Sequence, residues 1–244
     1  MPFKPIFGLK YWVSMFQYGY KMVVSRIFTL IDLRLDIFFI NYYLNNSIVG
    51  IYTVAGALSN VFWIATTSIS MVLFPRAASL GPEESKKLTC LICRNFLWLT
   101  VIFGGLFLLI CKPLIVFVYD EKFAPAAGAF ALLLPGIIGG VISRICFTDC
   151  SARGYPGRSS IAAAITATMT IIFDLLLIPK HGMYGAAVAS SIAYCTGGVL
   201  GIYWHMKLSG NTLSSLILPR KDDLKYYINT YTKIKNKFCS SRSQ

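Results

Sequence analysis

Six long apolar stretches, separated by short polar segments, dominate the pattern of hydrophobic and polar positions along this chain. Most are roughly 20 residues long, the length that a helix needs, at about 1.5 Å per residue, to cross about 30 Å of hydrocarbon. One water-soluble core would not produce such runs. The pattern therefore predicts an all-α, polytopic membrane protein with about six transmembrane helices, at residues 23–43, 48–73, 96–118, 126–147, 160–178 and 186–206.

Proline, glycine and charged residues mark the expected ends of these spans. We expect Pro75 to stop the second helix, because proline lacks an N–H donor and clashes with a continuing helix. Residues 81–87 are expected to form a polar loop, and Pro179 with Gly182 to close the fifth span. The six spans assign residues 1–210 to a transmembrane lobe and residues 211–244, rich in lysine and arginine, to a cytoplasmic tail.

Composition agrees with a membrane protein and narrows the functional classes. Hydrophobic residues make up 56% and charged residues 14% of the chain, whereas soluble domains carry about 25% charged residues. The net charge is +13, but the cations lie mostly between apolar runs rather than on a soluble face, so we expect no nucleic-acid partner. The sequence contains no nucleophile paired with a base, no histidine cluster and no phosphate-binding loop. We therefore expect no enzyme and no cofactor.

The distribution of Lys and Arg predicts the orientation, because cytoplasmic loops collect these residues. Assigning alternate loops to opposite sides places 19 of the 23 cations on the side that holds both termini. We expect both termini to be cytoplasmic in a cell inner membrane, with Asn46, Lys122 and Lys180 on the outer side. No cleavable signal peptide is expected, so the first helix directs insertion.

Ionisable residues inside the first span are the sharpest candidates for a functional site. Each costs about 2.5 to 3.5 kcal/mol on membrane-insertion scales, so such residues tend to mark a binding cavity or pathway. Asp32 and Asp36 are four residues apart and share a helix face, while Arg34 lies about 160° round the helix from Asp32. We expect Arg34 to bind an anionic group and Asp36 to help hold it in place.

Other spans carry further charges. Asp174 lies deep in the fifth span and joins the predicted cavity residues, whereas Arg144 and Asp149 lie near the cytoplasmic end of the fourth. Two interpretations remain open for the charged residues as a group. They either line a polar cavity that binds a charged substrate or relays protons, or they form interhelical pairs that only stabilise the bundle.

Several short motifs resemble the C-terminal half of polysaccharide flippases, which belong to the multidrug/oligosaccharidyl-lipid/polysaccharide exporter superfamily. The most specific is the turn Pro-x-x-Gly-x-x-Gly-Ala-Ala at residues 179–187. The others lie at residues 34–36 (RLD), 49–55 (VGIYTVA), 73–75 (LFP) and 123–126 (FAPA).

The resemblance implies one lobe of a two-lobe transporter that moves lipid-diphosphate-linked oligosaccharide to the outer leaflet by alternating access. The implied partners are that substrate, membrane lipid, and either a separate N-terminal lobe or a second copy of the chain. Two alternatives stay open: a drug or small-cation exporter lobe, which would favour a cavity dominated by carboxylates, and a non-transporting membrane subunit or gene fragment. Genes for sugar transferases beside this one would favour the flippase.

Overall fold

The structure is a computed structural model that describes residues 9–210 and 212–219, without the side chains of residues 9–12, 14 and 31–34. The described residues form α-helices and one short 3-10 turn, with no strand among them. The elements are α1 (Leu9–Tyr43), α2 (Asn46–Ser79), α3 (Pro82–Tyr119), η1 (Glu121–Phe123), α4 (Ala126–Ala152), α5 (Pro156–Ser209) and α6 (Leu213–Ile217).

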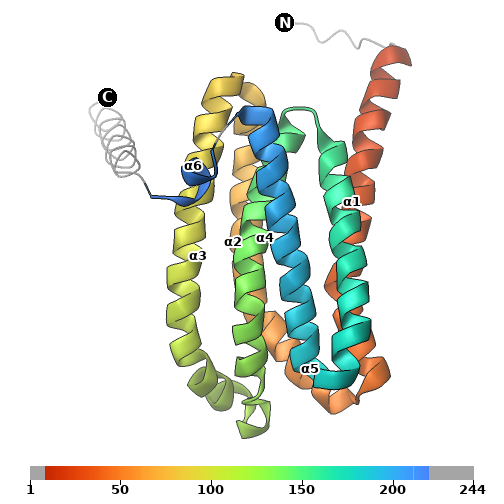
Figure 1. Cartoon of the computed structure of the whole chain (residues 1–244), viewed down its shortest axis with the longest axis vertical. Coiled ribbons are helices and arrows are strands. Elements are labelled where there is room, and N and C mark those ends of the chain that lie inside the picture. The colour runs from red at the N-terminus through yellow and green to blue at the C-terminus, as the bar shows by residue number, and fades with distance from the viewer. Residues whose placement is uncertain (1–8, 211, 220–244) are drawn as a thin grey trace, which may run out of the picture.

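Helix α5 folds back on itself at Gly182, so its 54 residues form two antiparallel rods (Figure 1). Gly182 has φ 59° and ψ −139°, a conformation that is costly for any residue with a Cβ atom. Three residues later, a Cβ at Gly185 would overlap with the carbonyl of Leu177. These two glycines explain the predicted turn, and the two rods of α5 complete the predicted lobe of six long helices.

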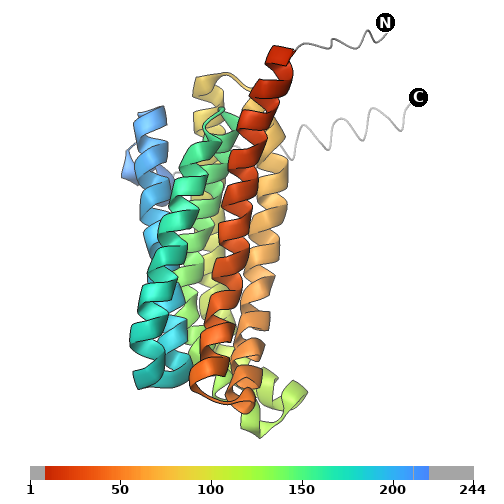
Figure 2. The same ribbon diagram turned by 90° about the vertical axis from the view of Figure 1, so that its right-hand side faces the viewer.

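Four of the described helical segments are long and apolar enough to cross a membrane: α2, α3, η1 with α4, and α5. Helix α1 does not meet that composition because its second half contains four ionisable residues. It is nevertheless 35 residues long and lies between α2 and the first half of α5 (Figure 2). Its apolar neighbours are therefore other helices as well as the bilayer, so a lower hydropathy is tolerated.

Two predicted helix ends were wrong. Helix α2 continues through Pro75 to Ser79, because a proline inside a helix removes one backbone hydrogen bond, to the residue four positions earlier, and leaves the N–H groups that follow it free to continue the helix. Helix α3 begins at Pro82, so residues 82–87 are its first turns rather than a loop. Proline suits the first position of a helix, and Glu83 and Glu84 stabilise the positive end of the helix dipole.

Helix α4 lies at the centre of the bundle, in contact with α2, α3 and α5 (Figure 1). Its Phe130 is fully buried and packs against Phe62 of α2 and Phe107 of α3, with ring centroids 6.2 and 5.5 Å apart. On the opposite side, α4 meets the second half of α5 almost backbone to backbone. A Cβ at Gly139 would lie 2.7 Å from the Cα atom of Cys195, and one at Gly198 would lie 2.7 Å from the carbonyl oxygen of Gly139.

Candidate functional site: a basic cavity between four helices

A cavity with a volume of about 720 Å³ opens between α1, α2, α4 and α5, in the half of the bundle where α1 begins. Sites for small molecules commonly measure about 300 to 1,000 Å³, so the cavity has room for a ligand headgroup. Its lining mixes aromatic, hydroxyl and basic side chains, among them Ser25, Arg26, Thr29, Trp63, Thr67, Ser70, Phe74, Ser143, Arg144, Phe147, Thr148, Ser159, Thr166 and Tyr194.

Two arginines from different helices give the cavity its charge. Arg26 comes from α1 and Arg144 from α4, and no acidic side chain lies among the described lining residues. A guanidinium group presents several N–H donors in a planar fork, which matches the oxygens of a phosphate or carboxylate. The described lining is thus suited to an anion rather than a cation.

Several hydroxyl groups around the arginines donate their protons to helix carbonyls. Thr67 donates its proton to the carbonyl oxygen of Trp63 at 2.7 Å, and Thr148 donates to that of Arg144 at 2.7 Å. Thr29 donates in the same way to the carbonyl of Ser25 at 2.9 Å. Such hydroxyls keep lone pairs for a ligand but have already used their proton. The donors available to an anion are therefore chiefly Arg26 and Arg144.

The site residues predicted from the sequence are not among the described residues that line this cavity. Asp36 is buried between helices, where it accepts hydrogen bonds from the Tyr52 hydroxyl at 2.6 Å and from the Ile37 N–H at 2.9 Å. Asp174 is fully buried in the first half of α5, and neither carboxylate lines the cavity. Asp32 and Arg34 lie in α1, but their side chains fall outside the described part of the structure.

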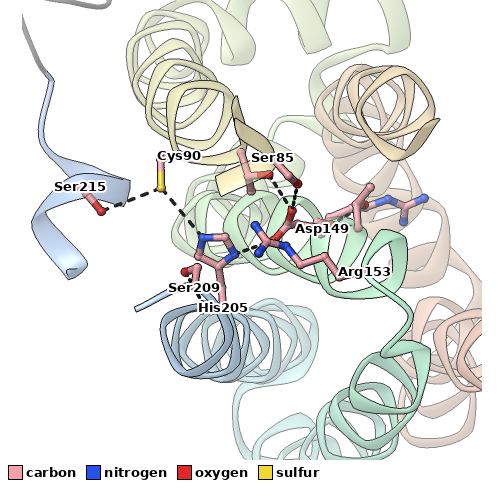
Figure 3. Close-up of polar contacts among 10 residues, drawn as sticks. Ser85, Cys90, Asp149, Arg153, His205, Ser209 and Ser215 are labelled. Atoms are coloured by element: carbon pink, nitrogen blue, oxygen red, sulfur yellow. Dashed lines mark hydrogen bonds and ion pairs between the residues drawn. The ribbon is translucent and has the colours of Figure 1, made fainter. Parts of the chain in front are cut away.

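A second polar cluster surrounds Asp149, which is fully buried where α3, α4 and α5 meet (Figure 3). The hydroxyls of Ser85 and Thr89 donate to its Oδ1 atom at 2.9 and 3.0 Å. Its Oδ2 atom lies 2.9 Å from Nε of Arg153 and 3.1 Å from Nδ1 of His205, which is itself fully buried. The carboxylate therefore joins three helices through four polar partners, which makes it a structural centre of this end of the bundle.

The same region holds the segment that follows α5. Arg94 of α3 donates to the carbonyl oxygen of Ser215 at 2.7 Å, and Nε1 of Trp98 donates to that of Ile217 at 2.9 Å. Leu216 between them is fully buried. The short helix α6 is thus attached to α3, and it lies beside α3 in Figure 1. The basic residues from 220 onward lie outside the described part of the chain.

Comparison with known proteins identifies the family of this chain. Residues 1–128, more than half of the sequence, match the family described as polysaccharide biosynthesis protein. The chain belongs to this family. It is similar to a probable low-salt glycan biosynthesis flippase, Agl15, of Haloferax volcanii, with 23% identity over 84% of this chain and 46% of that protein. An uncharacterized membrane protein of Methanocaldococcus jannaschii is 28% identical over 84% of this chain and 41% of its own length.

Solved structures agree on the fold. A MOP superfamily transporter from Pyrococcus furiosus superimposes with a TM-score of 0.61 at 16% identity, covering 87% of this chain and 49% of the transporter. A multidrug resistance MATE family transporter in an outward-facing conformation gives 0.60 at 17% identity, with the same coverage. This family member is therefore a multi-pass membrane protein with the fold of one transporter lobe. It spans less than half the length of the curated relatives and about half of the solved chains.

Proposed function

We propose that this chain is one lobe of a flippase that moves lipid-diphosphate-linked oligosaccharide across the inner membrane for polysaccharide biosynthesis. The observation that carries the proposal is the cavity with Arg26 and Arg144 and with no acidic side chain among its described lining residues. In this proposal the two guanidinium groups bind the phosphate oxygens while the lipid tail stays in the bilayer.

The charge of the lining argues against the alternative of a drug or small-cation exporter. A cation bound at membrane depth needs a carboxylate or another compensating group, because an unpaired charge is expensive there. The buried carboxylates that are described, Asp36, Asp149 and Asp174, all lie outside the cavity lining. The basic lining instead provides the compensating charge for an anionic headgroup.

A second lobe completes the proposed transporter. The relatives are about twice as long as this chain, and the cavity opens at the surface of the lobe between α1, α2, α4 and α5. Two-lobe transporters bind their substrate between the halves and expose it alternately to the two sides. We propose that a separate lobe or a second copy of this chain closes the cavity, with both termini of this chain cytoplasmic.

Complementation of glycan export, with the partner lobe supplied and activity normalised to folded protein in the membrane, tests the assignment. Arg144→Ala should lower export per folded molecule on the order of tenfold, because a hydrogen bond to a charged group contributes about 1.5 to 3 kcal/mol. Arg144→Lys should retain part of the activity, since it keeps the charge but loses the fork. Arg76→Ala is the matched control, because Arg76 is an exposed arginine of α2 outside the cavity. Equal export by Arg144→Ala and Arg76→Ala would contradict the proposal.

A further inference from the structure

The aromatic part of the cavity lining is built around Trp63. This residue lies on α2, and its ring meets that of Tyr194 from the second half of α5 edge to face, with centroids 5.3 Å apart and planes at 78°. Both side chains line the same cavity as Arg26 and Arg144. An edge-to-face pair of this kind orients the two rings relative to each other. Trp63 is therefore held in the cavity wall in a defined orientation.

Gly140 on α4 leaves the space that the indole of Trp63 occupies. A Cβ at Gly140 would overlap with Cη2 of Trp63 and lie 3.0 Å from Cζ3 and 3.3 Å from Cζ2. The six-membered part of the indole therefore rests against the bare backbone of α4, in space that any other residue would fill. Gly105, by contrast, has nothing within 4 Å of its Cβ position. The absence of a side chain at residue 140 allows Trp63 to sit where it does.

The spacing along α4 relates this ring to the basic group. Arg144 follows Gly140 by one turn on the same face of the helix, a rise of about 6 Å. This distance along the helix is comparable to the distance between a phosphate group and the ring of the sugar attached to it. A headgroup with its phosphate at Arg144 would therefore bring its first sugar beside Trp63, toward the middle of the bundle.

The hydroxyl groups that line the cavity with Trp63 suit a sugar ring. One face of a pyranose presents C–H groups that pack on an aromatic ring, while its hydroxyls point outward and donate hydrogen bonds. Thr67 and Thr166 each give their own proton to a helix carbonyl, at 2.7 and 3.1 Å, and keep their oxygen lone pairs for such donors. Both line the cavity together with Trp63.

We propose that Trp63, held by Gly140 and Tyr194, is a stacking platform for the first sugar of the lipid-linked headgroup. Gly140 is then a specificity-determining position, because it determines how closely the indole of Trp63 packs against α4. This inference rests on the proposed function, since it assumes that a phosphate lies at Arg144. A platform fixed in advance loses little side-chain freedom on binding, so it favours a ligand that carries a ring over one that ends in phosphate.

Binding of two probes to the purified full chain in lipid nanodiscs, with the partner lobe supplied as in the export assay, tests the platform. One probe is a polyprenyl diphosphate, and the other is the same lipid carrying a single N-acetylglucosamine. The wild type should bind the sugar-bearing probe more tightly, on the order of tenfold. Trp63→Ala should remove this preference and leave the affinity for the plain diphosphate unchanged. Trp63→Phe should keep part of the preference, and Gly140→Ala should reduce it. Gly105→Ala and Phe117→Ala, on α3 outside the cavity, are the matched controls, and the Phe117 side chain is 89% exposed.

The outcomes separate this inference from the function on which it rests. Equal binding of both probes by the wild type, with loss of both in Arg144→Ala, would overturn the platform and leave the anion site standing. An equal loss of both probes in Trp63→Ala, with a properly folded protein by size exclusion, would show that Trp63 shapes the whole cavity rather than contacting the sugar, and would overturn the platform. Binding of neither probe by the wild type would overturn both the platform and the proposed function.

Discussion

Replacing Asp149 should destabilise the lobe more than any other removal of a single described carboxylate. Asp149→Ala takes away the acceptor for Ser85 and Thr89, the counter-charge for Arg153 and the acidic partner of His205. The Arg153 side chain is only 14% exposed and that of His205 is fully buried, so little water can replace the lost partner. Removing one member of a buried pair costs about 3 to 5 kcal/mol, which is a large fraction of the stability of a domain.

Two further variants show how much of this free energy comes from the charge of Asp149 and how much from its interaction with Arg153. Asp149→Asn keeps an oxygen acceptor for the two hydroxyls but loses the negative charge, so the free energy of unfolding should fall by an intermediate amount of about 1 to 3 kcal/mol. Combining Asp149→Ala with Arg153→Ala should cost less than the sum of the single changes, because the two side chains interact directly at 2.9 Å. The exposed Lys87, replaced in Lys87→Ala, is the control at the same end of the bundle.

Unfolding in detergent micelles, followed by the folded fraction against denaturant, measures these differences. Near-UV circular dichroism at a fixed detergent concentration provides the signal, and the linear dependence on denaturant gives the free energy. If Asp149→Ala lies within about 0.5 kcal/mol of Lys87→Ala, the range expected for surface changes, the cluster does not stabilise the lobe and the reasoning fails.

Three other predictions follow from named residues. Arg34→Ala should lower glycan export severely at unchanged membrane abundance and Arg34→Lys partially, in the complementation assay; an equal fall in folded protein and export would instead identify a structural pair. Gly182→Ala should cost about 1 to 3 kcal/mol in the unfolding assay, because residue 182 has φ 59°, whereas Gly105→Ala, within α3, should not destabilise the lobe. With native cysteines removed, Lys122→Cys and Lys180→Cys should react with a membrane-impermeant thiol reagent from the outer side; labelling from the cytoplasmic side alone would exclude the predicted orientation.

The lengths of the hydrophobic runs were enough to predict the helices, because a segment inside the bilayer must form its backbone hydrogen bonds within itself. The ends of the helices were harder to predict, since Pro75 and Pro82 look alike in sequence. Pro75 lies inside a helix, just before its last turn, whereas Pro82 starts one. Whether a proline breaks or begins a helix depends on the neighbouring turn, which local composition does not specify.

Only part of the candidate site could be predicted from the sequence. Arg144 and Asp149 looked like neighbours at one end of the fourth span, yet five residues correspond to about 140° round a helix. That angle sends Arg144 to the cavity and Asp149 to the cluster with His205. Periodicity could have separated them, but it could not reveal which helices face each side. His205 gave no signal at all, because a single histidine in an apolar run has no spacing to interpret.

The glycine contacts between α4 and the second half of α5 have a mechanical consequence. Where two backbones touch, as at Gly139 and Gly198, there are no side chains to change rotamer and no space for sliding, so the two rods form one stiff plate. Helices α1 and α2 face that plate across the cavity. In the proposed transporter, a movement that changes the shape of the cavity would therefore leave this plate intact and displace α1 and α2 relative to it.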